Sequence, residues 1–370
     1  MARTVAYLTP LYFDERSYLG GGERYPLNLA RGVVEAGAGR VKVELISFGQ
    51  HARRLELAPG VGLRVLPIAG KVHDPLDVTS WDLPDALAEA DLVHIHQVFT
   101  RCAELGMLVA KQQGKPVVVS DHGGHSSPLG AEAGILDLAD RIVAYSYFGA
   151  SMYGRIDKQI DIIKGGVDAS TFVPPPNRLE RDRILYVGRL LPHKGIDRLI
   201  AAMPSDLPLT VCGRPYHAPY YKRLQSLAIG KNVTFVTDAD DELIKKFYWR
   251  SWANVLPSVH VDCYGQVHRM PELMGFTLLE AMACGSPAIC ARTAAMPEFI
   301  RQGETGFVYE DLDELEAILR RLASSPGLSD RMGDAARADV IEHYDLRVAG
   351  RKMLGIYDEL LARGRREVAA

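Results

Sequence analysis

The sequence predicts an α/β protein of two Rossmann-like, doubly wound domains, and three observations carry that prediction. The chain has 370 residues, which is long for one domain and suits two of ordinary size. Short apolar runs alternate with helical segments, as they do in parallel sheets. A proline-rich and then charged stretch, residues 172–183, interrupts this alternation, which afterwards starts again. We interpret that stretch as a linker and expect a first domain over residues 1–172 and a second over residues 173–352.

Composition and charge narrow the class of protein. Hydrophobic residues make up 47% and charged residues 24% of the chain, as in soluble globular proteins. The formal net charge of -3 argues against a nucleic-acid partner, which normally requires a basic excess. We find neither an apolar run of the roughly 18 residues that span a membrane nor a signal peptide at the N-terminus. The five cysteines are dispersed without a C-x-x-C pair, so we expect a cytoplasmic protein with reduced thiols.

The first half begins with a strand and a glycine cluster. Residues 4–10 form a short apolar run that ends at a proline, and Gly20 to Gly22 precede a helical pattern over residues 25–36. Strand, glycine loop and helix form the phosphate-binding arrangement of doubly wound folds, but the third glycine of the dinucleotide fingerprint is absent, which argues against a dehydrogenase. A flexible loop without a ligand is the alternative. Further strands are expected at residues 41–48, 63–68, 91–98, 116–122, 141–146 and 160–168.

Four histidines lie near two of these strand ends. His94 and His96 share one face of a strand, and no cysteine or carboxylate completes a zinc-binding spacing, so we expect core histidines rather than metal ligands. His122 differs because it lies in a glycine-rich turn directly after a strand, where parallel sheets bind their ligands. We therefore predict that His122 contacts a ligand.

The second half restarts with a strand at residues 184–187, the turn glycine Gly188, and a basic loop. Arg189 and Lys194 flank this loop at a strand end, where two cations suit a diphosphate. A solvated charged loop is the alternative. Strands at residues 207–214 and 232–238 and a helix over residues 241–252 continue the alternation.

A D-x-D sequence, Asp238 to Asp240, is a motif that some sugar transferases use to hold a divalent metal. Here Asp240 comes directly before a helical pattern, and capping of that helix explains it without a ligand. We therefore predict no metal.

A glycine, Gly275, opens an apolar run over residues 277–284 that is typical of a short buried helix. The start of a helix exposes unpaired N–H groups and a partial positive charge, which suit a phosphate. Glu272 and Glu280 lie on either side and cannot bind an anion, whereas carboxylates bind hydroxyl groups. A nucleotide sugar carries hydroxyls on both sides of its diphosphate, so we expect this segment to bind one. Alternatively, Thr277 and Glu280 form a T-x-x-E capping box, which needs no ligand.

Together these motifs resemble the retaining family 4 glycosyltransferases of the GT-B fold, also called glycosyl transferases group 1. In the second half the matching motifs are GRLLPHKG, the E-x7-E of Glu272 and Glu280, EAMACGSPAI and PEFI…GETGF. In the first half they are GGGERY, DLVHIH, SDHGG and GGVD…F.P. The resemblance spans nearly the full chain and implies two Rossmann-like domains facing each other across a deep cleft. It also implies that a C-terminal helix, over about residues 353–370, packs back on the first, acceptor-binding domain.

The resemblance implies a metal-independent reaction in which the sugar of a nucleotide sugar, with UDP preferred over GDP, passes to an acceptor hydroxyl on its original face. No cofactor is expected. The implied catalytic residues are His122, Glu272, Arg189 and Lys194. The implied donor-binding residues are Gly21, Gly22, Gly188, Arg189, Lys194, Arg214, Val236, Glu272, Leu273, Met274, Gly275, Phe276, Thr277 and Glu280. The acceptor, a glycan, a lipid-linked sugar or a small molecule, is expected at first-domain loops with aromatic faces that stack on sugars: Tyr12, Phe13, Tyr18 and His125. Packing within the first domain is the alternative for these residues.

Two departures from the family pattern stand out. The family usually has Asn before GVD, where this chain has Gly165 followed by Gly166, so a side-chain contact to the donor is missing. Residues 259–271 form an insertion, which we expect to touch the donor sugar or the acceptor rather than to bind a metal. Three arginines near the C-terminus are too few for more than a weak peripheral membrane contact: Arg363, Arg365 and Arg366.

Two other functions fit parts of the pattern. A nucleotide-sugar epimerase of the same architecture would use the same donor but need no acceptor. A non-catalytic, two-lobed sugar-binding protein would normally be exported, and the paired cations Arg189 and Lys194 argue against it.

Overall fold

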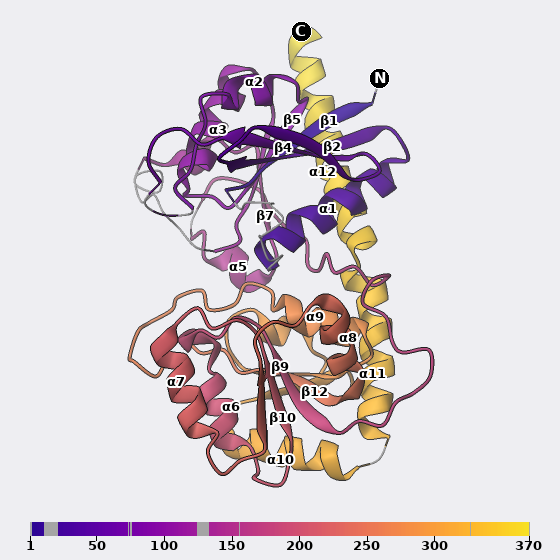
Figure 1. Cartoon of the computed structure of the whole chain (residues 1–370). Coiled ribbons are helices and arrows are strands. Elements are labelled where there is room, and N and C mark those ends of the chain that lie inside the picture. Colours follow the sequence, from indigo (N-terminus) through magenta and orange to yellow (C-terminus); the bar gives the residue numbers. More distant parts are fainter. Residues whose placement is uncertain are drawn as a thin grey trace. The chain divides into compact units, whose positions relative to one another are not determined.

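The computed structural model describes residues 2–10, 21–72, 74, 76–123, 133–154, 156–325 and 327–369. The chain forms two compact units, of which unit 1 comprises Met1–Gly166 with Leu346–Ala370 and unit 2 comprises Val167–Asp345 (Figure 1). Each unit is an α/β structure on its own largely parallel sheet, which confirms the predicted fold class. All four residues predicted to bind the acceptor lie outside the described residues, namely Tyr12, Phe13, Tyr18 and His125.

The sheet of unit 1 has the strand order β3-β4-β2-β1-β5-β6-β7-β8. All neighbouring pairs are parallel except β3 and β4, which form an antiparallel pair at one edge. That edge strand was not predicted, because its sequence RRLELA is charged and largely exposed and shows no buried run. The strands are β1 (Arg3–Leu8), β2 (Val41–Gly49), β3 (Arg53–Ala58), β4 (Val61–Pro67), β5 (Leu92–His96), β6 (Val117–Ser120), β7 (Arg141–Ala144) and β8 (Ile160–Ile162).

Strand β8 ends well before residue 168, the predicted end. Gly165 and Gly166 have φ angles of 95° and 98°, a backbone conformation that an extended strand cannot contain. Gly166 is also confined by packing, because a Cβ there would lie 3.0 Å from the ring of Tyr25. A close approach to an aromatic ring therefore accounts for this glycine.

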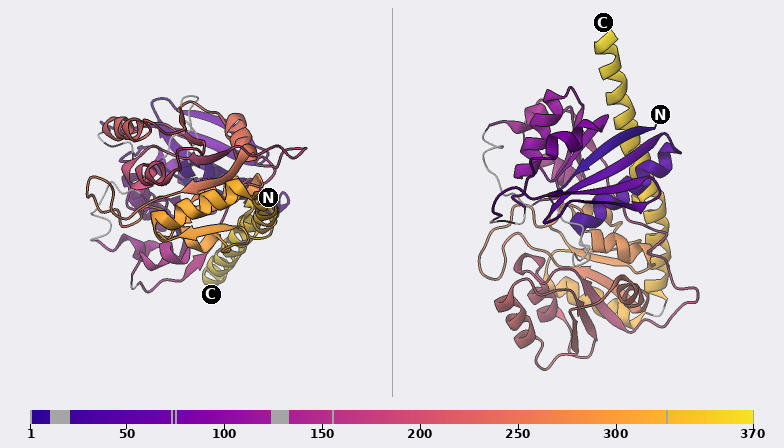
Figure 2. Two further views of the ribbon diagram at one scale, coloured as in Figure 1. Left: turned by 90° about the horizontal axis from the view of Figure 1, so that it is seen from below. Right: turned by 45° about the horizontal axis from the view of Figure 1, so that its top comes forward.

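The helices of unit 1 include one pair in unusually close contact. Helix α12 crosses α1 where Gly32 faces Gly350, and Figures 1 and 2 show α12, in yellow, alongside α1. α12 begins at Leu346, seven residues before the predicted start, because the apolar face that it packs on α1 begins there. The helices are α1 (Gly21–Gly37), α2 (Leu83–Ala88), α3 (Arg101–Gln112), α5 (Tyr147–Ser151) and α12 (Leu346–Ala369).

The sheet of unit 2 has the order β11-β10-β9-β12-β13-β14, and every neighbouring pair is parallel. Figure 1 shows α6 and α7 on one side of this sheet and α8, α9 and α11 on the other. The strands are β9 (Arg183–Val187), β10 (Leu209–Cys212), β11 (Val233–Val236), β12 (Ser251–Leu256), β13 (Ala288–Ala291) and β14 (Gly306–Tyr309). The helices are α6 (Ile196–Ala202), α7 (Ala218–Leu227), α8 (Asp241–Arg250), α9 (Phe276–Ala283), α10 (Leu312–Ser324) and α11 (Leu328–Asp339).

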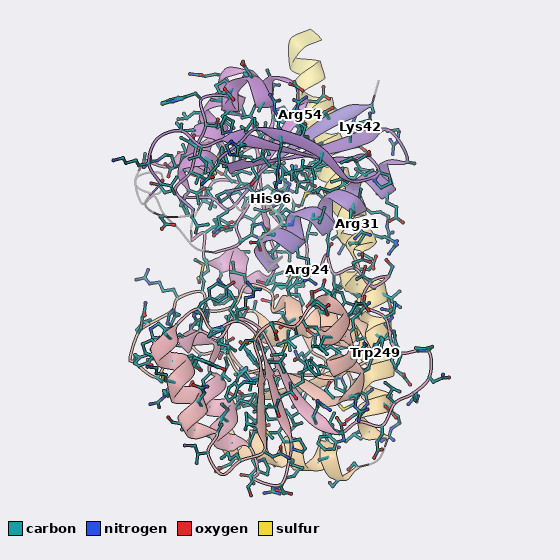
Figure 3. All side chains as sticks on the ribbon, viewed as in Figure 1. Arg24, Arg31, Lys42, Arg54, His96 and Trp249 are labelled. Atoms are coloured by element: carbon teal, nitrogen blue, oxygen red, sulfur yellow. The ribbon has the colours of Figure 1, made fainter. Side chains whose placement is uncertain are left out.

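The proline-rich stretch predicted as a linker is instead an ordered part of unit 2. Arg181 donates to the carbonyl of Ser251 at 2.6 Å and to that of Gly285 at 2.8 Å, and it pairs with Asp330. The indole of Trp249, labelled in Figure 3, donates to a carbonyl of the same stretch at 2.7 Å. The linker interpretation is therefore wrong, because proline and charge are typical of linkers but do not exclude a stretch tied down by such hydrogen bonds.

The predicted capping role of Asp240 in the D-x-D sequence is confirmed. Asp240 is the N-cap of α8, and its carboxylate accepts a hydrogen bond from the backbone N–H of Leu243 at 2.8 Å.

In the described part of the chain, no helix is both long and apolar enough to cross a membrane.

Candidate active site

The carboxyl ends of β9, β10 and β11 place several of the predicted donor-binding residues along one edge of the unit 2 sheet. Gly188 directly follows β9, and Gly213 directly follows β10 and donates to the carbonyl of Val236 at 2.8 Å. A Cβ on Gly213 would lie 2.8 Å from the carbonyl carbon of Gly188, so the two turns meet backbone to backbone. Arg189 is exposed and Arg214 is half-buried beside these turns. This edge therefore presents two guanidinium groups on a tightly packed backbone.

An ion pair joins two of the predicted catalytic residues, Lys194 and Glu272. Lys194 ends a short 3₁₀ turn, and Gly195 follows it with a φ of 65°. The Lys194 ammonium contacts Oε1 of Glu272, and the hydroxyl of Ser258 donates to the same oxygen at 3.1 Å. Both charged side chains are only 12% exposed, and a pair at this depth needs such additional hydrogen bonds to hold its geometry. Ser258 was missed by the sequence reasoning, where its only signal was its position just after a strand.

The start of α9 is open in the way that the phosphate prediction requires. Gly275 is the N-cap, with φ 72° and ψ 55°, and no side chain of the described residues caps the helix. The capping-box alternative is therefore wrong, because Thr277 lies inside the helix rather than at its N-cap. Leu273 and Met274 connect this N-cap to Glu272, and Met274 is buried. Within the described ranges, the backbone N–H groups of the first residues, Phe276 and Thr277, have no side-chain cap.

Glu280 lies one turn into α9, and its side chain is buried. The residue is 4% exposed, and the hydroxyl of Tyr248 donates to the carbonyl of Thr277 at 3.3 Å and lies 3.5 Å from Oε2 of Glu280. The side-chain amide of Asn254 also donates to the carbonyl of Thr277, at 3.4 Å. Tyr248 and Asn254 thus hold the first turn of α9 from α8 and β12. Neither was predicted, since both lie within ordinary apolar patterns.

The insertion at residues 259–271 forms a hairpin that is anchored beside the basic loop. The Val259 N–H donates to the carbonyl of His193 at 2.9 Å, and the rings of His193 and His268 lie 4.8 Å apart. Asp262 accepts a hydrogen bond from Nε2 of His268 at 2.9 Å. Burial raises the pKa of Asp262, but hydrogen bonds from His268 and two backbone amides bring it below its usual value. In the described residues, no group of three or more His, Cys, Asp or Glu side chains could hold a metal ion.

In unit 1, His122 belongs to a buried cluster of aromatic and imidazole rings. His96, at the end of β5, is fully buried, whereas His122 is half-buried as a residue. Nδ1 of His96 lies 3.2 Å from Nε2 of His122. The hydroxyl of Tyr145 lies 3.1 Å from the same Nε2. His94 bonds the hydroxyls of Tyr357 at 2.6 Å and Ser120 at 2.8 Å. His94 is thus a core histidine with both nitrogens bonded, as predicted.

Burial controls the charge of these rings. Desolvation lowers the pKa of His94 and His96 well below the usual value and lowers that of His122 to about 3. All three imidazoles are therefore neutral near pH 7. His122 can act there as a hydrogen-bond donor or acceptor but not as a cation.

Two of the three clustered glycines lie in a helix rather than in the predicted loop, and Gly20 lies outside the described residues. α1 begins at Gly21, so Gly21 and Gly22 belong to its first turn. The next turn carries Tyr25, whose buried ring lies 5.4 Å from the ring of His122. The structure thereby brings the start of α1 next to the imidazole cluster of unit 1.

Comparisons with known proteins agree with this arrangement. Residues 170–339 match the model described as "Glycosyl transferases group 1", and residues 19–171 match "Glycosyltransferase Family 4". The chain is 26% identical to a D-inositol 3-phosphate glycosyltransferase of Acidothermus cellulolyticus, across 99% of this chain and 91% of that protein.

Two solved structures show the same fold. Sucrose-phosphate synthase from Thermosynechococcus elongatus superposes with a TM-score of 0.76 at 21% identity and covers 98% of this chain and 100% of its own. Anabaena Alr3699/HepE, solved in complex with UDP and glucose, has a TM-score of 0.73 at 18% identity over 96% of this chain and 100% of its own. With both family models matched in succession along the sequence, the chain belongs to the group 1, family 4 glycosyltransferases, is an enzyme of that class and has the GT-B fold.

Proposed function

We propose that the protein is a retaining, metal-independent glycosyltransferase that moves a hexose from a nucleoside diphosphate sugar to an acceptor hydroxyl. UDP is the preferred nucleotide and GDP the next. The observation that carries the proposal is the arrangement in unit 2 of the Lys194–Glu272 pair, the Ser258 hydroxyl and the uncapped start of α9.

The diphosphate is assigned to the cationic part of this arrangement. Lys194 supplies a point charge, Arg189 a guanidinium that can bind two phosphate oxygens, and the first N–H groups of α9 a partial positive charge. Negative charge grows on the diphosphate as the bond to the sugar breaks. Positive groups fixed beside the diphosphate stabilise this charge in the transition state. Such electrostatic stabilisation is usually the largest single contribution to the rate enhancement.

The hydroxyl groups are assigned to the carboxylates. Glu272 contacts sugar hydroxyls near the anomeric carbon, and its orientation is set by Lys194 and Ser258, which hold one oxygen and leave the other for a ligand. Glu280, one turn further along α9, is assigned to the ribose. The partner hydroxyl of Tyr248 supports a carboxylate held in one orientation.

The reaction itself follows the pattern of the family. The leaving diphosphate takes part in removing the proton from the acceptor hydroxyl, so the new bond forms on the face that the nucleotide leaves. His122 is neutral and is assigned to a sugar hydroxyl rather than to a charge. The HepE complex with UDP and glucose supports the donor class. The acceptor stays unassigned.

Substitution of Lys194 tests the diphosphate assignment. Lys194→Ala should lower turnover of UDP-glucose or GDP-mannose by about two orders of magnitude, in line with the loss of one transition-state charge contact. The matched control is Lys246→Ala, an exposed lysine of α8 in the same unit, which should turn over donor like the wild type. Equal activity of the two variants would refute the assignment.

Two further measurements separate the rival functions. Product analysis with and without an acceptor mixture distinguishes transfer from epimerisation, because only the epimerase converts donor alone into a second nucleotide sugar. Activity that survives EDTA supports the metal-independent mechanism, and a strict need for Mg²⁺ or Mn²⁺ would overturn it. A thermal-shift comparison of UDP and GDP identifies the base, since a ligand at 100 times its Kd stabilises by about 2.7 kcal/mol.

A further inference from the structure

The imidazole cluster of unit 1 contains a ring that the proposed function does not use. His96, labelled in Figure 3, is fully buried at the end of β5. Its ring lies beside that of His94, with centroids 4.1 Å apart and the two planes tilted by 32°, and it is nearly parallel to that of His122, with centroids 5.4 Å apart. A buried imidazole in this position needs a physical reason, because its polar nitrogens lose water.

Among the described residues, only one of the two nitrogens of His96 has a hydrogen-bond partner. Nδ1 lies 3.2 Å from Nε2 of His122, whereas Nε2 of His96 has no hydrogen-bond partner among the described residues. Both rings are neutral near pH 7, because burial lowers their pKa values, so each carries a single proton. A hydrogen bond between the two nitrogens requires that one of them donates and the other accepts.

The two possible arrangements differ in what they leave buried. If His122 donates from Nε2, the proton of His96 is on its own Nε2, and a buried N–H has no acceptor. If His96 donates from Nδ1, its Nε2 carries only an unused lone pair. Buried N–H groups without an acceptor are much rarer in proteins than acceptors without a donor, because the lost hydrogen bond to water is not replaced. The second arrangement is therefore favoured.

We propose that His96 is a positioning residue that donates from Nδ1 to Nε2 of His122 and thereby holds His122 as the Nδ1–H tautomer. His122 then presents an N–H donor at Nδ1 and no free acceptor. A ligand that His122 contacts is consequently recognised through an oxygen that accepts a hydrogen bond, such as a sugar hydroxyl or ring oxygen. This last step rests on the proposed function, whereas the tautomer does not.

The tautomer is measured directly by NMR on the full chain with ¹⁵N-labelled histidine. Two-bond correlations from the ring carbon protons separate protonated from unprotonated nitrogens, and the signals of His122 are identified by their loss in His122→Gln. The wild type should show His122 protonated at Nδ1 only. A wild-type His122 protonated at Nε2 would overturn the proposal without any other variant.

Two substitutions at His96 separate positioning from packing. His96→Asn keeps an N–H donor at the place of Nδ1, since the amide nitrogen of Asn is the same number of bonds from the backbone. His96→Leu fills similar space without a donor. We expect His122 to stay Nδ1–H in His96→Asn and to gain the Nε2–H form in His96→Leu. An Nδ1–H tautomer that persists in His96→Leu would contradict the proposal, as would its loss in both variants.

Tyr145→Phe is the matched control at the same nitrogen, because the Tyr145 hydroxyl is the other group within hydrogen-bond distance of Nε2 of His122. The proposal expects the Nδ1–H tautomer to survive in Tyr145→Phe. Loss of this tautomer in Tyr145→Phe, together with its survival in His96→Leu, would assign the positioning role to Tyr145 instead. If His96→Leu does not fold, the tautomer of His122 in the wild type, His96→Asn and Tyr145→Phe still tests the proposal.

Ligand measurements keep this proposal separate from the proposed function. Binding of UDP, followed by calorimetry, should be unchanged in His96→Leu, because the nucleotide is assigned to unit 2. Hydrolysis of UDP-glucose should lose about tenfold in kcat with a smaller change in KM, the usual size of effect for a partner that orients a contacting group. Absence of both UDP and GDP binding by the wild type would refute the proposed function and leave the tautomer result standing.

Discussion

Replacing Gly350 by alanine tests what holds the C-terminal helix on unit 1. α12 crosses α1 at two glycines, and a Cβ added to Gly350 would lie 2.6 Å from the backbone nitrogen of Val33 and closer still to the carbonyl of Gly32. The obstacle is backbone and cannot rotate away. Gly355 lies one and a half turns further along the same helix, and a Cβ there meets nothing within 4 Å. The two glycines are therefore a matched pair.

The expected magnitudes follow from two opposing effects. Alanine in place of glycine within a helix gains about 1 kcal/mol from helix propensity at either position. At Gly350 the added methyl forces α12 away from α1, and overpacking of this kind costs roughly 3 kcal/mol when side chains cannot relieve it. Gly350→Ala should thus lower the free energy of unfolding of unit 1 by about 2 kcal/mol, whereas Gly355→Ala should raise it by about 1 kcal/mol.

The three tryptophans allow the two units to be followed separately. Trp81 is 85% exposed in unit 1, whereas Trp249 and Trp252 are half-buried in unit 2, so fluorescence reports mainly on unit 2 and circular dichroism reports on both. Urea unfolding of Gly350→Ala should shift the dichroism curve to lower urea and leave the fluorescence midpoint in place. Equal stabilities of the Gly350→Ala and Gly355→Ala variants would refute the close backbone crossing.

Three further predictions concern charge. Arg141 is 2% exposed and pairs with Asp161 and Glu359 at 2.9 Å each. The double variant Asp161→Asn, Glu359→Gln leaves this buried cation without a partner, so it should lower the free energy of unfolding by roughly 3–5 kcal/mol. Arg141→Met should lower it less, and urea unfolding measures both. Lys231 donates to three carbonyls at the end of α6, at 2.7 to 2.9 Å. Lys231→Met should therefore lower the free energy of unfolding of unit 2, followed by fluorescence, by roughly 1.5–3 kcal/mol. The control Lys246→Met, at an exposed lysine, should leave it unchanged. The pKa of His94, His96 and His122 is lowered on folding, so the unfolded chain binds more protons and stability falls as the pH drops from about 6.5 toward 3. Each ring changes the free energy of unfolding by up to about 1.4 kcal/mol per pH unit. Unit 1 should therefore unfold at a higher pH than unit 2 when acid is added, as measured by circular dichroism and tryptophan fluorescence.

The fold was largely predictable because its signals are local. A parallel strand buried on both faces is a short apolar run, and the alternation of such runs with helices is visible without any knowledge of contacts. The features that were missed have weak local signals. β3 is a charged edge strand, and the proline-rich stretch is ordered by Arg181, which reaches carbonyls 70 and 104 positions away. Composition at these places indicates exposure, and exposure alone does not distinguish a strand, a linker and an ordered loop.

The candidate site was predictable in its residue types and not in its pairings. The sequence places Lys194 after one strand and Glu272 after another, and both were expected to face the donor. That they contact each other depends on two strand ends meeting at one end of the sheet, although the two residues are 78 positions apart in the sequence. The supporting residues Ser258 and Tyr248 were missed for the same reason, because a serine or a tyrosine in an apolar segment has no local signal for a carboxylate partner.

The C-terminal helix connects the stability of unit 1 with its imidazole cluster. Tyr357 of α12 lies with its hydroxyl 2.6 Å from Nδ1 of His94 and 2.8 Å from the hydroxyl of Tyr7, so the last element of the chain completes the environment of a histidine near its beginning. If Gly350→Ala moves α12 off α1, Tyr357 withdraws and His94 loses a hydrogen bond that no other described residue replaces. The ring signals of His94 should then shift in Gly350→Ala and stay in place in Gly355→Ala. A local sequence pattern cannot predict this dependence of His94 on α12, because the contact forms only when the C-terminal helix packs beside the N-terminal strands.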